Sequence, residues 1–274
     1  TETLKLAGNN APANDAGVLL CFILNCEKSF LYSHGTMEMS DKSEGDYFNL
    51  IRERAFGKPL QYLTGRQEFM SLVFEVGQGV LVPRQETEIL VEKVIDFCRD
   101  FKKDIKILDI GTGSGCIAAS LAHYLPSAFV TATDKMPEAL VIARRNILRL
   151  GVDDRVKLIQ SDLFETVENE QFDVIVSNPP YIPSSDIDKL QDEVRRYEPR
   201  CALDGGEDGL FFYRAITAKA PEFLRKGGLL AFEAGIGQAD KIAGLMAGSF
   251  ESIEIYKDLA GIDRLVTGRL KAAN

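Results

Sequence analysis

The spacing of hydrophobic residues changes along this chain and divides it into three regions. In the first region, stretch 46–56 carries its apolar residues at helical spacing among charges. Stretch 15–24 is apolar enough for a buried helix, whereas 34–45 is polar and predicted to be a loop. The pattern therefore predicts an N-terminal helical domain over residues 1–67.

The second region, residues 68–84, has the pattern of a β-hairpin. Apolar residues recur on both sides of the sequence Gly77-Gln78-Gly79, which is typical of two strands joined by a turn. We expect this hairpin to link the helical domain to the remainder of the chain.

The third region, residues 85–274, begins with a helix and then alternates buried strands with helices. This alternation predicts an α/β domain with a mostly parallel sheet. A last pair of strands has the pattern of a terminal hairpin. The predicted strands, seven in all, are 105–110, 129–133, 156–160, 172–177, 229–233, 252–256 and 264–270.

Composition favours a soluble globular protein. The 274 residues are 45% hydrophobic and 27% charged, and no apolar run approaches the roughly 20 residues that span a bilayer. Residues 1–14 lack the patterns of a targeting segment. The five cysteines are odd in number and form no Cys-x-x-Cys pair, which favours reduced thiols. We therefore expect a cytoplasmic protein that is not bound to a membrane.

Charge and histidine content exclude two further classes of function. A formal net charge of −9 argues against direct, sequence-independent binding of nucleic acid. Only two histidines are present, His34 and His123, and they are far apart in the sequence, so we expect no metal site. The acidic turn at 204–208 lacks the alternating ligands of a calcium loop.

A glycine-rich turn follows the first predicted strand of the α/β domain. Glycines let the backbone approach a ligand closely, and the start of the next helix favours an anionic group. The dinucleotide-binding fingerprint would need glycine or alanine at position 116, where this chain has Cys116. The turn indicates a nucleotide-like ligand of another kind. It consists of Gly111, Thr112, Gly113, Ser114 and Gly115.

Two aspartates at the ends of the next strands strengthen this interpretation. Asp134 follows the loop by about 20 residues, at a position where a carboxylate accepts hydrogen bonds from ribose hydroxyls. Asp162 ends the third strand and could accept from an adenine amino group, with Leu163 or Phe164 covering the ring. A strand-end aspartate is equally often a helix cap, so Asp162 alone decides nothing.

The sequence Asn178-Pro179-Pro180-Tyr181 follows the fourth strand, at a further position where ligands bind in such sheets. Prolines lack N–H donors and fix φ, so the carbonyls of this segment are free to accept hydrogen bonds. The Asn178 side-chain oxygen and the Pro179 carbonyl could each accept one hydrogen of a planar amino group, with Tyr181 over its face. The alternative is an ordinary proline-rich loop.

Taken together, these motifs resemble those of the HemK/PrmC family, the protein-(glutamine-N5) methyltransferases of peptide-chain release factors. Methyltransferases of other substrate classes share the Asn-Pro-Pro-Tyr motif, whereas segments 202–210 and 258–264 are more particular to this family. Gln85 departs from the family pattern, which usually has proline there. The remaining segments that carry the resemblance are 57–65, 81–88 and 233–238.

The resemblance implies a class I methyltransferase that uses S-adenosylmethionine (SAM). It has a Rossmann-like, mostly parallel seven-stranded sheet, an N-terminal helical domain that recognises the substrate, and a β-hairpin linker. Residues 111–115, Asp134, Asp162, Leu163 and Asn178 would hold SAM. Asn178 to Tyr181 would hold the glutamine of the Gly-Gly-Gln loop of a release factor. An amide needs no strong general base, and none is expected.

Two alternatives remain at this point. A nucleic-acid methyltransferase acting on adenine N6 or guanine N2 would use the same pocket, and a SAM-binding regulatory protein would lack turnover. Two further residues are equally open. Arg84 could orient the substrate or the hairpin, or form a structural ion pair. Glu233, at a strand end, could support the residues that contact the substrate, although a carboxylate at a strand end needs no function.

Overall fold

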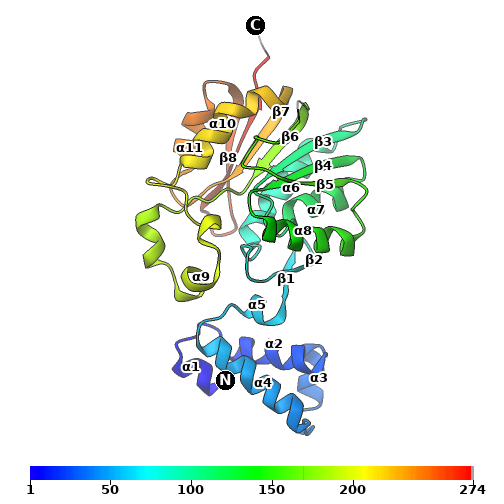
Figure 1. Cartoon of the computed structure of the whole chain (residues 1–274), viewed down its shortest axis with the longest axis vertical. Coiled ribbons are helices and arrows are strands. Elements are labelled where there is room, and N and C mark those ends of the chain that lie inside the picture. The colour runs from blue at the N-terminus through cyan, green and yellow to red at the C-terminus, as the bar shows by residue number, and fades with distance from the viewer. Residues whose placement is uncertain (169, 273–274) are drawn as a thin grey trace. The chain divides into compact units, whose positions relative to one another are not determined.

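The computed structural model describes residues 1–168 and 170–272, which form two compact units. The smaller unit contains residues Thr1–Arg66 together with Leu190–Tyr197, and the larger unit contains the other described residues. Segment 190–197 thus belongs with residues that precede it by more than a hundred positions. Figure 1 shows the helices and strands of each unit.

The smaller unit is helical. Its small core contains Leu4, Leu19, Ile51 and Leu63, and residues 41–45, expected to be a loop, are the first turns of a helix. The Ser40 side chain accepts a hydrogen bond from the Ser43 backbone N–H, which caps this helix and extends it towards the N-terminus. The helices are α1 (Glu2–Leu6), α2 (Pro12–Leu24), α3 (Lys28–Ser33), α4 (Asp41–Ala55), α5 (Leu60–Thr64) and α9 (Asp192–Tyr197).

A buried ion-pair network holds α9 in the smaller unit. The Arg54 guanidinium lies 2.8 Å from the Asp15 carboxylate and 2.9 Å from the Glu193 carboxylate. Arg54 also donates a hydrogen bond to the Lys58 carbonyl. Since Arg54 and Asp15 are largely buried, loss of either partner would leave an uncompensated charge.

The larger unit begins at Gln67, within the hairpin of β1 (Arg66–Phe69) and β2 (Leu72–Glu75), and the predicted position of the hairpin turn was wrong. The turn is Met70-Ser71, with φ of 51° and 57°, rather than 77–79. Positive φ at both central residues is usual in tight hairpin turns, but glycine or asparagine normally marks it. Here the Tyr124 hydroxyl donates to the Met70 carbonyl at 2.6 Å, so a contact distant in sequence holds the turn.

The seven-stranded, mostly parallel sheet expected from the sequence is confirmed. Its strand order is β5-β4-β3-β6-β7-β9-β8, and β9 runs in the opposite direction to the six other strands. The predicted terminal hairpin is formed by the last two strands. The strands are β3 (Ile105–Ile110), β4 (Ala128–Asp134), β5 (Val156–Gln160), β6 (Phe172–Ser177), β7 (Leu224–Glu233), β8 (Phe250–Lys257) and β9 (Asp263–Leu270).

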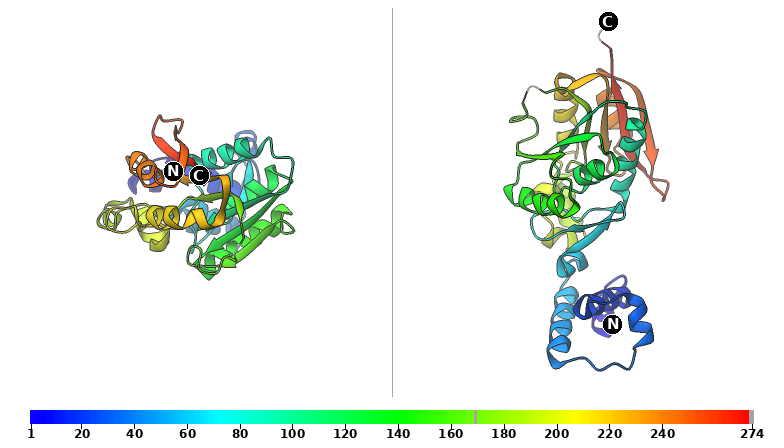
Figure 2. Two further views of the ribbon diagram at one scale, coloured as in Figure 1. Left: turned by 90° about the horizontal axis from the view of Figure 1, so that it is seen from above. Right: turned by 90° about the vertical axis from the view of Figure 1, so that its right-hand side faces the viewer.

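Helices cover both faces of this sheet, as Figures 1 and 2 show. Along β3, Ile107 contributes to the core under α6, α7 and α8, whereas Leu108 contributes to the core under α10 and α11. This alternation buries both faces, which explains why the central strands are almost continuously apolar. The helices are α6 (Glu88–Cys98), α7 (Cys116–Tyr124), α8 (Pro137–Leu150), α10 (Phe211–Phe223) and α11 (Ala239–Met246), the last of which was not predicted.

Short 3-10 helices join these elements near the carboxyl ends of the strands. They are η1 (Gln85–Thr87), η2 (Ser184–Lys189) and η3 (Arg200–Ala202). Within the described part of the chain, no helix is long and apolar enough to cross a membrane. All five cysteines are free thiols.

A fully buried asparagine ties the hairpin to helix α8 and to the glycine-rich turn. Asn146 on α8 accepts a hydrogen bond from the Glu75 backbone N–H at 2.6 Å and donates to the Glu75 and Ser114 carbonyls, both at 2.9 Å. The Asn146 amide thus satisfies backbone groups of β2 and of the glycine-rich turn together.

Asn146→Ala should lower the free energy of unfolding by about 2–4 kcal/mol, because it leaves buried backbone groups without partners. The matched control is Arg145→Ala, which removes an exposed ion pair to the Glu75 carboxylate and should cost less than about 1 kcal/mol. Urea unfolding of both variants measures the difference. Equal losses would mean that the Asn146 bonds contribute no more than a surface contact.

Candidate functional site

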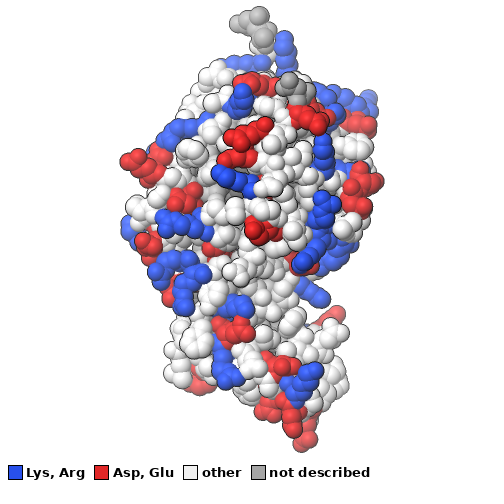
Figure 3. Space-filling model, viewed as in Figure 1, with Lys and Arg blue, Asp and Glu red and all other residues white. Residues whose placement is uncertain are grey.

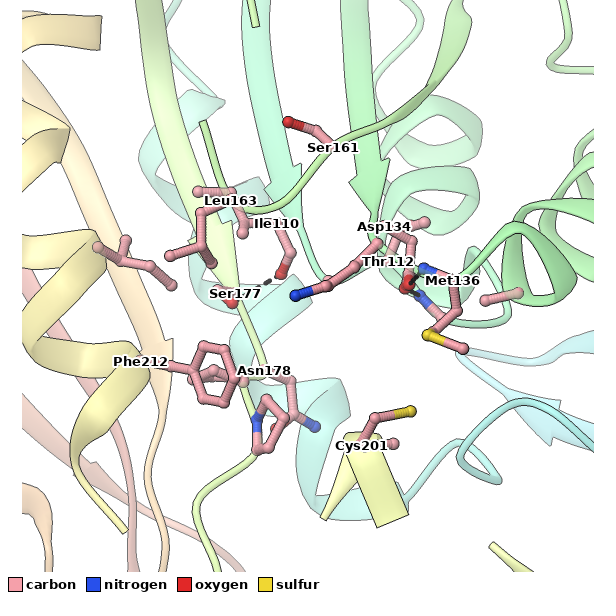
Figure 4. Close-up of a pocket in the computed structure, with 18 of the residues that line it drawn as sticks. Ile110, Thr112, Asp134, Met136, Ser161, Leu163, Ser177, Asn178, Cys201 and Phe212 are labelled. Carbon is pink, nitrogen blue, oxygen red and sulfur yellow. Dashed lines mark hydrogen bonds between the residues drawn. The ribbon is translucent and has the colours of Figure 1, made fainter. Parts of the chain in front are cut away.

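The structure brings most of the predicted site residues to one cavity. Strands β5, β4, β3 and β6 are neighbours in the sheet, and the predicted residues follow their carboxyl ends. The cavity there has a volume of about 1030 Å³ (Figure 4). Gly115 and Tyr181 are not among its lining residues. The predicted residues that line it are Gly111, Thr112, Gly113, Ser114, Asp134, Asp162, Leu163, Asn178, Pro179 and Pro180.

The glycine-rich turn has the backbone conformation that its sequence predicts. Gly111, Gly113 and Gly115 have φ of 75°, 55° and 79°, in the region that side chains disfavour. Gly115 faces away from the cavity: a Cβ there would lie 3.1 Å from the Ala143 Cβ on α8. Its role is thus the close packing of the turn on a helix, while the two other glycines line the cavity.

Main-chain hydrogen bonds hold the Asp134 carboxylate at the cavity wall. One oxygen accepts from the Gly113 N–H and the other from the Met136 N–H, both at 2.9 Å. Burial raises the pKa of Asp134, and these two bonds oppose the rise. Figure 4 shows Asp134 across the opening from Asn178 and Cys201. The carboxylate is therefore held in place beside the turn and can still accept bonds from a ligand.

Asp162 and Leu163 lie at the tip of β5. The Asp162 carboxylate pairs with the Lys135 ammonium at 2.6 Å, and both side chains are partly exposed. Such a pair contributes at most about 1 kcal/mol, so it does not prevent Asp162 from binding a ligand. Leu163 has a φ of 51°, which is rare for a residue with a side chain and often occurs at functional sites.

Asp109, the last but one residue of β3, is a buried carboxylate that the sequence interpretation did not single out. One of its oxygens accepts from the Thr112 hydroxyl at 2.6 Å. The other has no hydrogen-bond partner among the described residues. Burial raises the pKa of Asp109 to about 7. The Asp109–Thr112 bond fixes the Thr112 side chain within the turn.

The Asn178 amide is oriented by two residues from distant parts of the chain. Its Nδ2 donates to the Thr87 hydroxyl at 3.2 Å, and that hydroxyl donates to a Glu233 carboxylate oxygen at 2.5 Å. Thr87 ends η1 and Glu233 ends β7. Because Nδ2 faces Thr87, the Asn178 side-chain oxygen is left to accept from a ligand. The sequence interpretation did not propose Thr87, whose partner lies 146 positions away.

Two glycine-containing segments, 202–210 and 233–238, pack against residues 180–182. The Gln238 side chain donates to the Tyr181 carbonyl at 2.9 Å, and the Gly205 N–H donates to the Ile182 carbonyl at 2.8 Å. A Cβ at Gly205 would lie 2.7 Å from the Tyr181 Cα, and one at Gly209 would lie 2.3 Å from the Tyr181 carbonyl oxygen. Only glycine fits at these positions, which explains why segment 202–210 is so rich in it.

Arg84 forms a structural ion pair. It donates twice to the Glu198 carboxylate, at 2.7 Å to each oxygen, and Glu198 is buried. Both bonds come from one guanidinium nitrogen, so they hold the end of the Arg84 side chain against a carboxylate. Arg84 also lines the cavity, so the pair holds a cationic group at its wall.

Comparison with known proteins agrees with this geometry. Residues 85–194 match the family model of the methyltransferase small domain, and residues 1–65 match that of the PrmC N-terminal domain. A release factor glutamine methyltransferase from Geobacter sulfurreducens is 45% identical over 92% of this chain and 87% of its own length. One from Moorella thermoacetica is 44% identical over 95% and 92%.

The chain belongs to the release factor glutamine methyltransferase family. The resemblance and the methyltransferase class predicted from the sequence are thereby confirmed. Among solved structures, a methyltransferase from Pyrococcus furiosus superposes with a TM-score of 0.53 at 23% identity, covering 74% of this chain and 91% of that one. At this identity the likeness supports the fold alone.

In this family member, Gly209→Ala should destabilise the fold and displace Tyr181, because the added Cβ would overlap the Tyr181 carbonyl. Gly237→Ala is the matched control: its φ is 73° against 74° at Gly209, yet a Cβ there meets nothing within 4 Å. The free energy of unfolding should fall by at least about 2 kcal/mol more in the Gly209 variant than in the control. Thermal unfolding of both measures this, and equal losses would leave backbone strain as the sole cause.

Glu233→Gln should make the free energy of unfolding less dependent on pH. Burial raises the pKa of Glu233 from 4.5 to about 7. Since the folded state holds this proton more tightly, the stability it contributes is present below about pH 4.5 and is lost as pH rises through 7. Between about pH 4.5 and 8, the free energy of unfolding of the variant should therefore rise relative to that of the wild type by on the order of 3 kcal/mol. Denaturant unfolding across that pH range measures this difference. If the prediction is wrong, the free energies of unfolding of the two proteins will change with pH in parallel.

Proposed function

We propose that this chain transfers a methyl group from SAM to the side-chain amide nitrogen (N5) of the glutamine in the Gly-Gly-Gln loop of a peptide-chain release factor. The observation that carries the proposal is the orientation of Asn178, whose Nδ2 is engaged by Thr87 while its oxygen is left to the cavity. An acceptor of this kind beside the Pro179 carbonyl suits the two hydrogens of a primary amide.

The residues at the cavity fit SAM. The Asp134 carboxylate, held by two main-chain bonds, would accept from the ribose hydroxyls, and the turn at 111–114 would lie against the methionine portion. Asp162 and Leu163 would face the adenine. The cavity of about 1030 Å³ has room for both a cofactor and a substrate side chain. When bound, SAM would supply an electrophilic methyl group on a sulfonium.

The protein's own contribution to the reaction is alignment. An amide nitrogen is a weak nucleophile, because its lone pair is delocalised into the carbonyl. Bonds from its two N–H groups to the Asn178 oxygen and the Pro179 carbonyl would raise electron density on nitrogen. They would also hold it roughly 3–3.5 Å from the methyl carbon, which is a near-attack separation. The proton becomes acidic only as the new N–C bond forms, so no strong base is required.

Recognition of the release factor falls to the N-terminal helical unit in this proposal. A pocket that fits one planar amide offers little to distinguish it from another, so remote contacts must supply specificity. In the organisation predicted from the sequence, residues 1–67 form the substrate-recognition domain, 68–84 the linker and 85–274 the catalytic domain. The family model of residues 1–65 supports a unit that is particular to this family.

Nucleic acid would be the substrate in the rival function. On the face shown in Figure 3, Lys and Arg side chains are interspersed with Asp and Glu, and the formal net charge is −9. Both features disfavour binding to a phosphate backbone. No observation favours this rival over the protein substrate.

Incubation of the chain with labelled SAM and an intact release factor, followed by mass mapping of the methyl group, tests the proposal. We expect one methyl group on the glutamine of the Gly-Gly-Gln loop, and none on a release factor with that glutamine changed to alanine. Methylation of DNA adenine in the same assay would overturn the protein-substrate proposal. SAM binding without transfer to any substrate would instead favour a regulatory protein.

Asp134→Ala should weaken SAM binding by on the order of 1–3 kcal/mol, because a charged hydrogen-bond acceptor is lost. Isothermal calorimetry measures the affinity directly. Unchanged affinity would remove Asp134 from the proposed cofactor site.

Asn178→Ala should leave SAM binding nearly intact, because most of the proposed cofactor contacts come from the three other strand ends. The kcat should fall by about 10²-fold or more through lost alignment of the amide. Steady-state kinetics with a release factor separates the two effects. A variant with normal kcat and weak SAM binding would contradict the proposed amide contact.

A further inference from the structure

We propose that Thr87 and Glu233 are positioning residues that act through Asn178. Together they fix the Asn178 amide with its oxygen towards the substrate amide. This inference rests on the proposed function, and it adds two residues to which the sequence motifs give no role in the reaction.

The number of hydrogens and lone pairs on the Thr87 hydroxyl determines which way the Asn178 amide faces. A hydroxyl has one hydrogen to donate, and Thr87 gives it to the Glu233 carboxylate, which is ionised above its raised pKa of about 7. Only the lone pairs of the Thr87 oxygen are then left for Asn178. The Asn178 NH₂ group can donate to them, whereas its oxygen would meet another acceptor. The reversed amide is therefore disfavoured.

Burial makes this choice costly to reverse. Thr87 and Glu233 are each 2% exposed, so water cannot replace a lost hydrogen bond at either side chain. A reversed Asn178 amide would break the hydrogen bond from its NH₂ group to the Thr87 oxygen. The buried Thr87 oxygen would then lack this donor, which costs free energy. It would also point N–H groups at the N–H groups of the substrate.

The main-chain positions of Asn178 and Glu233 are fixed independently of this network. Asn178 follows Ser177, whose hydroxyl donates to the Ile110 carbonyl at 2.7 Å. Glu233 ends a strand paired on both sides, and its carbonyl accepts from the Tyr213 hydroxyl at 2.8 Å. Removing the Thr87 hydroxyl should therefore free the Asn178 side chain without moving the backbone that carries it.

Three variants separate positioning from general stability. Thr87→Val removes the hydroxyl with little change in shape, and Thr87→Ser restores it. Thr217→Val is the matched control, since Thr217 on α10 is a buried threonine whose hydroxyl has no partner among the described residues. Each variant is compared with the wild type in kcat and KM for an intact release factor, SAM affinity and melting temperature.

We expect Thr87→Val to lower kcat by about 10-fold or more while SAM affinity stays unchanged, because only the reacting amide loses its aligned acceptor. Thr87→Ser should remain within about 3-fold of the wild type, and Thr217→Val should match it. A normal kcat in Thr87→Val would overturn the inference. A kcat loss that Thr87→Ser does not reverse, or that accompanies an equal loss of SAM affinity, would overturn it as well.

A second measurement does not depend on turnover. In ¹⁵N-labelled protein, the Asn178 side-chain amide is identified by its absence in Asn178→Ala. One of its two protons should exchange slowly with solvent in the wild type and at least 10-fold faster in Thr87→Val. Equal exchange rates would overturn the fixed orientation. If the wild type fails to methylate a release factor, the proposed function fails, while this exchange difference still decides whether Thr87 fixes Asn178.

Discussion

Parallel pairing of β3 with β4 on one side and β6 on the other is the constraint on which the rest of the site depends. It brings the carboxyl ends of these strands to one edge of the sheet. Residues at these three strand ends, from Gly111 to Pro180, then line one cavity although they are about seventy positions apart in the sequence. The apolar runs that form these strands are buried on both faces, so the positions of the strand ends are set by the core.

Strand pairing places Asn178 but does not orient it. Orientation depends on segments that enter from elsewhere: η1 supplies Thr87, β7 supplies Glu233, and the loop after β7 supplies Gln238. Each of them satisfies a polar group at or near the Asn178 segment. The prolines at 179 and 180 make this outside support necessary, because they remove the N–H groups through which the segment could have held itself.

The parts of the site that were predictable from the sequence have local causes. The glycine-rich turn is marked by its own conformational demand, and Asp134 by its place at a strand end. The parts that were missed have partners far away in the chain. Thr87 is an unremarkable threonine in the sequence, and the Met70-Ser71 turn carries no glycine. Tertiary contacts, such as the Tyr124 hydroxyl at Met70, provide what the local sequence does not.

The same reasoning gives a physical basis for the expectation that segment 202–210 is more particular to the family than the Asn-Pro-Pro-Tyr sequence. That short sequence presents two acceptors, which suit any planar amino group, so many substrate classes can share it. Gly205 and Gly209, by contrast, face the backbone of Tyr181 at distances that no side chain would permit. Their constraint comes from how this protein packs a second loop against the first. A shared motif thus indicates the chemistry, whereas the glycines that support it indicate the particular structure in which that chemistry is held.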